Sequence, residues 1–329
     1  MKAVWVERYG PPGVLEVREM AVPVPGPREV MVRQAATNVS PADCAMRAAD
    51  PFIVRFFSGL LRPKAGIPGE TIAGTVEAVG AQVTRFAPGE RVFGITEMAM
   101  GALAELVVLP EDSALVRMPD GLSFEEAGGL PYSFLTAMPF LRDEAELRPG
   151  QRILIIGAAG SIGTVAVQLA RNMGAHVTAV CSTRNVELVR SLGADEVIDR
   201  TQVDFTTQQA MYDVVFDTVG KSSFRACRDV LTPGGIYLTT VPTFAIMMKM
   251  LFGNKPGQKR GKLATTGLRK PEPKRRDMDL LAEMVARGEL HSVIDRRFRL
   301  EQIAEAHAYV ETGTKAGDAI ILIGTPAEA

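Results

Sequence analysis

Residues 151–173 read QRILIIGAAGSIGTVAVQLARNM, and this stretch decides the fold of the chain. The apolar run Arg152–Ile156 has the length of a buried strand, and Gly163–Met173 repeats apolar side chains at helical spacing. Between them lies the glycine-rich loop Gly157–Gly163. A strand, a glycine-rich turn and a helix in this order predict a dinucleotide-binding element, because the free N–H groups at the helix N-terminus attract phosphate.

The glycines of this loop have separate uses. Gly160 lacks a Cβ, so the backbone can approach a pyrophosphate, and Gly163 lets the helix pack closely on the strand. Ala158 replaces one glycine of the usual G-x-G-x-x-G pattern, and a tight turn without a ligand is the alternative interpretation. The loop residues that we expect to contact the cofactor are Ala159, Gly160, Ser161, Ile162 and Gly163.

The two parts of the chain differ in their secondary-structure pattern. Residues 1–120 are punctuated by Pro and Gly and predict short strands separated by turns. After the loop, strand patterns at His176–Cys181, Asp213–Asp217 and Ile236–Val241 alternate with helical patterns. This alternation predicts a parallel, doubly wound sheet.

The residues after the second strand of this sheet choose between the two nicotinamide nucleotides. NAD-binding sites place a carboxylate there to bind the ribose 2′-hydroxyl. Here the strand ends at Cys181 and no acid is available in the residues that follow. Hydroxyl and guanidinium groups suit a 2′-phosphate, so we expect NADPH, bound by Ser182, Thr183 and Arg184. Arg200, which follows Ile198-Asp199 where members of the family resembled below often have Tyr, is a further expected phosphate contact. The alternative is that Ser182 caps a helix and that the arginines are solvated surface charges.

The overall composition excludes several classes of protein. The chain has 329 residues with 37 Lys and Arg against 38 Asp and Glu, and its net charge of −1 provides no general attraction to nucleic acid. No apolar run is long enough for an integral membrane span. The three cysteines have no CxxC spacing, which argues against a disulfide framework or a structural metal site. The N-terminus lacks a signal-peptide pattern, so we expect a cytoplasmic protein.

Short motifs along nearly the whole chain resemble those of the zinc-independent medium-chain dehydrogenase/reductases, the quinone oxidoreductase-like proteins. Each motif alone is weak evidence, but their order and spacing together are specific to this family. The motifs are Met1-Lys2-Ala3, Ser40-Pro41-Ala42-Asp43, Pro68-Gly69 with Ala73-Gly74-Thr75-Val76, Leu135-Thr136-Ala137, Pro149-Gly150, Gly193-Ala194-Asp195 with Ile198-Asp199, Asp217-Thr218-Val219-Gly220 and Pro233-Gly234-Gly235.

The resemblance implies the fold and the assembly. Members of this family have an α/β fold in which a Rossmann dinucleotide-binding domain is inserted into a β-rich, GroES-like catalytic domain. On this chain the catalytic domain would comprise residues 1–120 and 270–329, and the Rossmann domain would comprise residues 121–269 with a basic loop at its end. Homodimers are common in the family, so we expect a homodimer.

The matching positions lack the zinc ligands of the metal-dependent relatives. Those relatives carry a Cys and a Gly-His-Glu motif, whereas the corresponding stretch here is Pro68-Gly69-Glu70-Thr71, and Cys44 lies four residues after Ser40. The histidines lie elsewhere, at His176, His291 and His307. A catalytic zinc needs about three protein ligands, so we expect no metal.

The absence of a Lewis acid narrows the reaction. A conjugated carbonyl or a quinone accepts hydride at carbon and delocalises the developing charge, so the protein needs only to position the donor and offer a hydrogen bond. We therefore expect NADPH-dependent, metal-free reduction of a small hydrophobic quinone or α,β-unsaturated carbonyl. The alternatives are an enoyl-thioester reductase, whose basic stretch would hold a carrier phosphate, and a non-catalytic NADPH-binding redox sensor.

Three polar residues are candidates for the catalytic hydrogen bonds. Asp43 is the first by family position, although an Asp after Pro-Ala also makes local turn bonds. Ser40 replaces the Asn that is frequent in the family, so a bond to an oxyanion would come from a shorter hydroxyl. Tyr132 matches a region near the nicotinamide-facing helix, where it would donate to the substrate or pack within the helix. Some enoyl reductases use a Tyr shortly after the motif that corresponds to Ser40-Pro41-Ala42-Asp43. Here that region reads Asp50-Pro51-Phe52 and contains no Tyr, which argues against that mechanism.

The remaining cofactor contacts come from strand ends and from family position. In parallel sheets ligands bind at the carboxyl ends of the strands. That rule selects residues at the ends of the fourth and fifth strands. The family resemblance adds a threonine, whose hydroxyl and adjacent backbone would contact the cofactor. The residues so assigned are Thr136, Thr218, Val219, Val241 and Pro242.

Residues 244–276 interrupt the alternation of strands and helices. The apolar, Met-containing run Phe244–Phe252 precedes a strongly basic stretch, Gly253–Arg276. We expect the run to form a lid or wall of a hydrophobic pocket, because Met adapts to varied ligands. A dimer contact, a peripheral membrane contact and a helix packed on the core are the alternatives. We expect the basic stretch to be a loop that is disordered without ligand.

Overall fold

The computed structural model describes residues 1–329 except 65, 97–98, 208–210, 254–256 and 325–329. Its contacts divide the chain into two compact units, Met1–Tyr132 with Arg269–Ala329, and Ser133–Leu268. The second unit is therefore inserted into the sequence of the first, and the contacts place residues 121–132 with the first unit. The predicted α/β fold with an inserted nucleotide-binding domain is confirmed.

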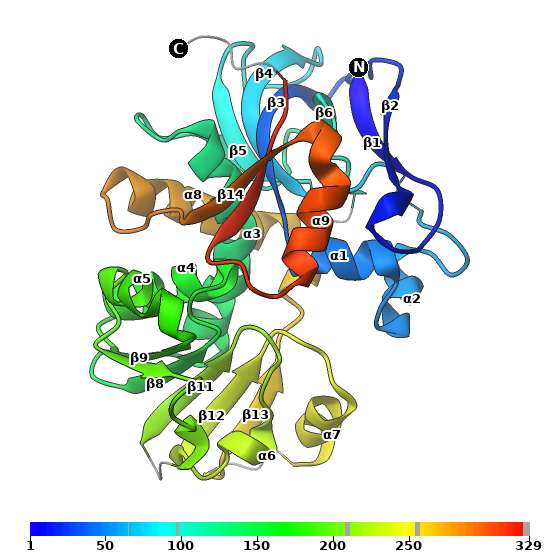
Figure 1. The fold of residues 1–329 in the computed structure, drawn as a ribbon. Coiled ribbons are helices and arrows are strands. Elements are labelled where there is room, and N and C mark those ends of the chain that lie inside the picture. The colour runs from blue at the N-terminus through cyan, green and yellow to red at the C-terminus, as the bar shows by residue number, and fades with distance from the viewer. Residues whose placement is uncertain (65, 97–98, 208–210, 254–256, 325–329) are drawn as a thin grey trace. The chain divides into compact units, whose positions relative to one another are not determined.

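A largely antiparallel sheet forms the centre of the first unit (Figure 1). Its described residues pair in the order β14-β15-β3-β4-β5-β7, with β6 also paired to β3 and with β14 and β15 parallel. A separate antiparallel pair is formed by β1 and β2. The strands are β1 (Lys2–Val6), β2 (Leu15–Glu19), β3 (Glu29–Val39), β4 (Thr71–Val79), β5 (Arg91–Ile95), β6 (Leu106–Pro110), β7 (Leu115–Arg117), β14 (Ile294–Arg299) and β15 (Asp318–Leu322).

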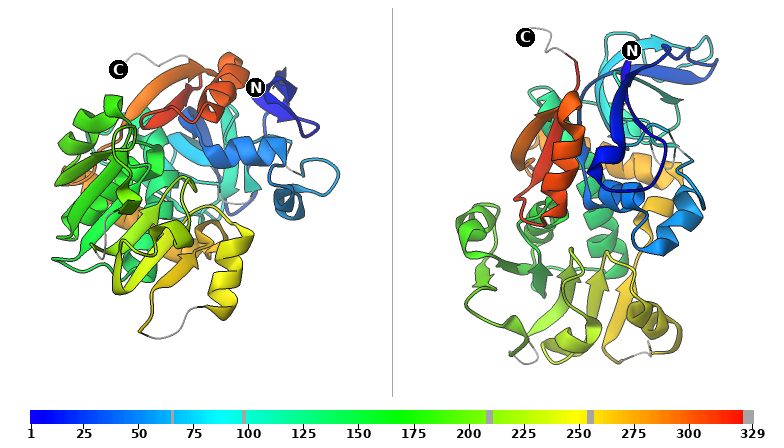
Figure 2. Two further views of the ribbon diagram at one scale, coloured as in Figure 1. Left: turned by 60° about the horizontal axis from the view of Figure 1, so that its bottom comes forward. Right: turned by 45° about the vertical axis from the view of Figure 1, so that its right-hand side comes forward.

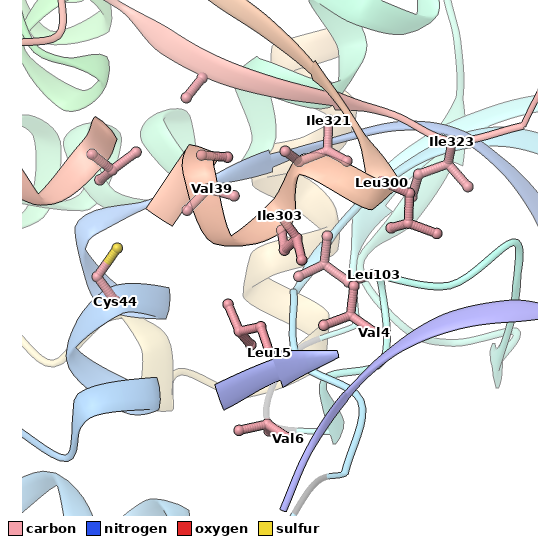
Figure 3. Close-up of a cluster of buried hydrophobic side chains, with 13 residues drawn as sticks. Val4, Val6, Leu15, Val39, Cys44, Leu103, Leu300, Ile303, Ile321 and Ile323 are labelled. Carbon is pink, nitrogen blue, oxygen red and sulfur yellow. The ribbon is translucent and has the colours of Figure 1, made fainter. Parts of the chain in front are cut away.

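The helices of the first unit are α1 (Pro41–Ala48), α2 (Arg55–Ser58), α3 (Phe124–Pro139), which continues into the second unit, α8 (Pro271–Ala286) and α9 (Ile303–Glu311). An apolar cluster joins α9 to the sheet and to α1. Figure 3 shows Ile303 of α9, Val39 of β3 and Ile321 of β15 within it, with Cys44 of α1 at one side. Burial of such side chains contributes about 1.5–3 kcal/mol each to stability. The cluster thereby holds α1, which carries two candidate site residues.

The second unit contains a parallel sheet of six strands among the described residues. The strand order is β10-β9-β8-β11-β12-β13 and every pairing is parallel. Its strands are β8 (Arg152–Ile156), β9 (His176–Cys181), β10 (Glu196–Asp199), β11 (Tyr212–Asp217), β12 (Leu231–Thr239) and β13 (Arg260–Leu263). Its helices are α4 (Ser161–Asn172), α5 (Val186–Ser191), α6 (Phe224–Cys227) and α7 (Phe244–Phe252). The order places β8 at the centre, so the glycine loop that follows it lies at the middle of the carboxyl edge.

The basic stretch after α7 differs from its prediction. Within it, Arg260–Leu263 is a strand that pairs with Ile236–Thr239 of β12, so the expectation of a continuous disordered loop is wrong there. Without this strand, the outer edge of β12 would expose unpaired backbone N–H and C=O groups. The hydrogen bonds that these groups form with Arg260–Leu263 outweigh the tendency of a basic segment to remain disordered. Residues 254–256 of the same stretch lie outside the described residues.

The apolar run before that stretch is helix α7, which packs beside β13 (Figures 1 and 2). Ile246 is buried, whereas Phe244 and Leu251 are 76% and 72% exposed. One face of α7 therefore packs on the core, as one alternative predicted, and another face remains exposed. No described helix combines the length and apolar character that crossing a bilayer requires.

Candidate functional site

The glycine loop has the geometry that a pyrophosphate requires. A Cβ on Gly163 would lie 2.2 Å from the carbonyl oxygen of Gly157, so only glycine allows α4 to approach the loop this closely. Gly157 adopts a φ of +78°, and a Cβ there would collide with Val219. Gly160 occupies the N-cap of α4 without a side-chain cap, and the positive end of the helix dipole lies there.

The loops after β11 and β12 lie beside the glycine loop. The Thr218 hydroxyl donates to the carbonyl of Ile156 over 2.9 Å, which joins the end of β11 to the end of β8. The carboxylate of Asp217 accepts the N–H groups of Val219 and Gly220 over 3.1 and 2.8 Å. A Cβ on Gly220 would lie 2.6 Å from the side chain of Val241, which shows that the two loops are in contact. The predicted residues Thr218, Val219 and Val241 are thus brought together with Ala159 and the rest of the loop, and exposed Pro242 follows.

The end of β9 differs from the prediction in one respect. The Thr183 hydroxyl donates to the carboxylate of Asp199 over 2.6 Å. Asp199 ends β10, and the parallel pairing places it opposite Cys181. Hydrogen bonds from Thr183 and Thr201 hold the pKa of Asp199 below its usual range, so the carboxylate is ionised. The expectation that no acid is available here is therefore wrong, because strand pairing supplies one from another part of the sequence.

The other predicted phosphate contacts remain compatible with a 2′-phosphate. Arg184 and Arg200 are exposed at the ends of β9 and β10. The Ser182 hydroxyl makes no helix-capping bond, and its oxygen lies 3.4 Å from Nδ2 of Asn185. The alternative in which the Ser182 side chain caps the helix is therefore not realised. Thr136 is half-buried on α3.

The first unit carries a second group of candidate residues, at the start of α1. The N–H of Asp43 donates to Ser40 Oγ over 3.2 Å, and the N–H of Ser40 donates to Asp43 Oδ2 over 2.8 Å, which forms a reciprocal capping box. The Ser40 hydroxyl also donates to Asp43 Oδ2 over 2.6 Å. Asp43 therefore makes the local hydrogen bonds that were predicted as its alternative role. These bonds hold its carboxylate against the Ser40 hydroxyl.

Tyr132 extends this arrangement into a chain of hydrogen bonds. Its hydroxyl bonds to the side chain of Ser40. This hydrogen bond lowers the pKa of Tyr132, so it favours the ionised phenol. Burial raises the pKa of Tyr132, and the carboxyl groups of Glu70 and Asp43 raise it further, so the phenol remains protonated. The three catalytic candidates are thus joined in the order Tyr132, Ser40, Asp43.

Glu70 belongs to the same cluster, and the sequence prediction did not include it. It is half-buried, and burial raises its pKa to about 8, with a further contribution from the charge of Asp43 and an opposing one from Lys274. One feature of the sequence could have identified Glu70 as a site residue. Glu70 follows Pro68-Gly69, in the element that carries the histidine of zinc-dependent relatives. Burial favours the neutral, protonated form of this side chain.

Strand register explains why Glu70 lies near Ser40. Strands β3 and β4 are antiparallel, so the end of β3 lies beside the start of β4. The Thr71 hydroxyl donates to Asn38 Oδ1 over 2.9 Å, and the Thr37 hydroxyl donates to the Thr71 carbonyl over 2.7 Å. Ser40 follows β3 and Glu70 precedes β4, so both lie at the same edge of the sheet.

Comparison with known proteins places this geometry in context. Residues 26–120 match the alcohol dehydrogenase GroES-like domain, and residues 192–321 match a family described as zinc-binding dehydrogenase. A quinone oxidoreductase of Pseudomonas aeruginosa is 33% identical over 98% of this chain and 99% of its own. A 2-methylene-furan-3-one reductase of Solanum lycopersicum is 30% identical, over 98% of this chain and 79% of its own. The solved quinone oxidoreductase of Coxiella burnetii has a TM-score of 0.84 at 26% identity, with 98% and 99% of the two chains covered.

The residues of this chain do not fit the zinc ion in the description of the second family. Within the described part of the chain, no three His, Cys, Asp or Glu side chains are grouped to hold a metal. Cys44 Sγ lies 3.4 Å from His307 Nδ1, but burial raises the pKa of the thiol to about 12 and lowers that of the imidazole to about 3. Zinc needs a thiolate and further ligands. This pair is a buried neutral contact.

Proposed function

This chain belongs to the medium-chain dehydrogenase/reductase family, in its quinone oxidoreductase-like group, and is an NAD(P)H-dependent oxidoreductase; from this premise we propose that it reduces a quinone or an α,β-unsaturated carbonyl with NADPH, without a metal ion. The hydrogen-bond chain from Tyr132 through Ser40 to Asp43 is the observation that carries this proposal. It provides a protonated hydroxyl and a route for its proton.

The cofactor residues of the proposal are those of the second unit. The glycine loop Gly157–Gly163 would hold the pyrophosphate, because its closest backbone approaches leave no room for a Cβ and because the N-terminus of α4, which favours negative charge, begins there. Thr218, Val219, Val241 and Pro242 would border the adenosine and the riboses, and Thr136 would contact the nicotinamide side. The bound reduced nicotinamide supplies a hydride to the substrate.

The preference for NADPH rests on charge at the ends of β9 and β10. Arg184 and Arg200 would pair with a 2′-phosphate, and Ser182 would donate a hydrogen bond to it. The Thr183 hydroxyl already donates to Asp199, so Thr183 contributes by holding that carboxylate rather than by binding the phosphate. The two arginines outnumber the one carboxylate, which favours the more negative nucleotide.

The substrate side of the proposal depends on a neutral donor. Reduction at carbon leaves negative charge on the carbonyl or quinone oxygen, and a hydrogen bond aimed at that oxygen lowers the barrier. Tyr132 is half-buried with its pKa raised, so it offers a proton at neutral pH. Asp43 and Ser40 are 5% and 1% exposed, and Ser40 is hydrogen-bonded to Tyr132.

Oxidation of NADPH, followed by its absorbance, tests the proposal with three acceptors in parallel: a small quinone, a small enone and an acyl thioester. Turnover with the quinone or the enone, and faster turnover with NADPH than with NADH, is the expected result. Turnover with the thioester alone would replace the proposal by an enoyl-thioester reductase. Tight NADPH binding without turnover of any acceptor would favour the redox sensor.

We also propose that the protein is a homodimer in the cytoplasm, as the resemblance and the sequence predict. Sedimentation equilibrium measures the assembly directly. A mass equal to one chain at micromolar concentration would contradict the dimer.

A further inference from the structure

One carboxylate joins the ends of two neighbouring strands at the carboxyl edge of the parallel sheet. Asp199 ends β10, and the parallel pairing places it opposite Cys181 at the end of β9. Its Oδ2 accepts the Thr183 hydroxyl over 2.6 Å, from the segment that follows β9. Its Oδ1 accepts the backbone N–H and the hydroxyl of Thr201 over 2.9 and 2.7 Å. The segments after the two strands are therefore held together through one side chain.

The residues that this carboxylate joins are the direct neighbours of the two arginines assigned to the 2′-phosphate. Arg184 follows Thr183, and Arg200 precedes Thr201. The N–H of Arg200 also donates to the carbonyl of the last residue of β9 over 2.9 Å, which fixes its backbone against that strand. Both arginine side chains are exposed. The backbone from which each guanidinium extends is thus set by bonds that meet at Asp199 or beside it.

We propose that Asp199 is a positioning residue for NADPH: its carboxylate clamps Thr183 to Thr201 and thereby sets the two neighbouring arginines where they bind the 2′-phosphate. This inference rests on the proposed preference for NADPH and identifies the residue that gives this preference its geometry. The acid then promotes NADPH binding, although its charge alone would oppose it.

The carboxylate is occupied by the protein's own donors and does not bind the ribose itself. A carboxylate has about four lone-pair sites for donors. Thr183 and Thr201 fill three of them, and Nε2 of Gln202 donates to Oδ2 over 2.9 Å. These bonds, with that from Thr183 as the largest contribution, hold the pKa of Asp199 below its usual range. The acid of an NAD-binding site instead accepts the ribose 2′-hydroxyl, which requires a free lone pair.

The geometry of arginine explains why position outweighs one nearby charge. A guanidinium binds phosphate strongly through two parallel N–H···O bonds, and these form only when its plane is correctly oriented. Repulsion between exposed charges is screened by salt within about 8 Å at physiological ionic strength, whereas the direct bonds are much less affected. We therefore expect the loss of the clamp to cost more than the removal of one negative charge gains.

Nucleotide fluorescence titration of the full chain at about 0.15 M salt tests the clamp. Asp199→Ala should weaken NADPH binding about 5-fold or more and leave NADH binding nearly unchanged. Asp204→Ala is the matched control, because Asp204 accepts the N–H and the hydroxyl of Thr206 over the same 2.9 and 2.7 Å. Within the described part of the chain Asp204 has no hydrogen bond to the segment after β9, so the ratio of the two dissociation constants should not change.

Two results of this titration would overturn the inference. Tighter NADPH binding by Asp199→Ala would show that the carboxylate acts only through its charge. Equal weakening of NADPH and NADH would show that it stabilises the fold without positioning the phosphate contacts.

Substitution of Thr183 separates the clamp from the charge, and it also serves if Asp199→Ala fails to fold. Thr183→Val removes the hydroxyl and leaves the carboxylate in place, so it should weaken NADPH by a similar factor. Thr183→Ser keeps a hydroxyl and should restore most of the affinity. In the double variant the two losses should be far from additive, because both break the same bond. Additive losses would mean that Thr183 binds the phosphate itself, which would overturn the clamp.

The proposed function and this inference fail in different ways. If the wild-type protein turns over no quinone or enone, the proposed reduction is wrong, and the titrations still decide the role of Asp199. If it turns over with NADPH and Asp199→Ala keeps the ratio of the two dissociation constants, the proposed function stands and the clamp is wrong. Tighter binding of NADH than of NADPH by the wild-type protein would contradict the nucleotide preference and the clamp together.

Discussion

The Ser40 hydroxyl donates to Asp43 Oδ2 over 2.6 Å, while the backbone N–H of Asp43 donates to Ser40 Oγ. One pair of residues therefore both caps α1 and continues the hydrogen-bond chain from Tyr132. The stability of α1 and the reduction chemistry depend on the same two side chains, so their substitution affects both measurements.

Substitution of Ser40 should affect both the stability of α1 and turnover. Ser40→Ala loses the cap and the chain, and should lower the free energy of unfolding by about 1 kcal/mol and kcat by about 10-fold or more. Ser40→Thr retains a hydroxyl and a favourable N-cap, so it should restore most of both. Urea unfolding and steady-state kinetics measure the two effects. A Ser40→Ala enzyme with reduced stability but unchanged kcat would show that the bond is structural only.

Removal of the Tyr132 hydroxyl should affect the chemical step. Tyr132→Phe keeps the ring in α3 but removes the donor, so kcat should fall roughly 100-fold while KM for NADPH changes little. Tyr9→Phe is the matched control, because that hydroxyl bonds Ser58 and the Gly59 carbonyl. Steady-state kinetics with the best acceptor measures both variants. Equal kcat values for wild type and Tyr132→Phe would remove Tyr132 from the proposed site.

The arginine after β9 should distinguish the two nucleotides. Arg184→Ala should weaken NADPH binding by about 10-fold or more, the effect of one charge-assisted bond, and leave NADH binding nearly unchanged. Arg190→Ala, an exposed arginine of α5 paired with Glu187, is the control. Nucleotide fluorescence titration gives both dissociation constants. Equal weakening of NADPH and NADH would contradict a 2′-phosphate contact.

The glycine at the start of α4 should tolerate no Cβ. In Gly163→Ala the new Cβ would meet the Gly157 carbonyl oxygen at 2.2 Å and Ala158 backbone atoms at 2.7 Å, so loop or helix must shift. We expect a loss of about 1–3 kcal/mol in the free energy of unfolding, together with weaker NADPH binding. Gly267→Ala, where a Cβ has nothing within 4 Å, should change neither. Thermal unfolding and nucleotide titration test both variants, and wild-type behaviour of Gly163→Ala would refute the close approach.

Buried His307 should make stability depend on pH. Burial lowers its pKa from 6.5 to about 3, and Arg47 contributes to the shift. Between these values the unfolded chain binds a proton that the folded protein does not, so stability is complete above pH 6.5 and declines as the pH falls. The slope is up to about 1.4 kcal/mol for each pH unit. His307→Asn should remove this slope, whereas substitution of exposed His291 should retain it; urea unfolding between pH 4 and pH 7 measures the slopes.

The nucleotide loop could be predicted from the sequence because its signals are local. A strand, a glycine turn and a helix lie within residues 151–173, and the glycines serve contacts within that element. The candidate site was predicted only in part. Asp43, Ser40 and Tyr132 were named from motif positions, but neither their hydrogen bonds nor the contribution of Glu70 follows from a local pattern.

The sequence by itself determined the fold class, the glycine loop and the family, because periodicity and short motifs encode them along the chain. Tertiary structure decided three other features: Asp199 beside Thr183, β13 on the edge of β12, and Glu70 beside Asp43. Each depends on strand pairing or burial that joins residues far apart in sequence. Such pairing sets both the nearby charges and the exclusion of water, and these determine whether a carboxyl group keeps its proton.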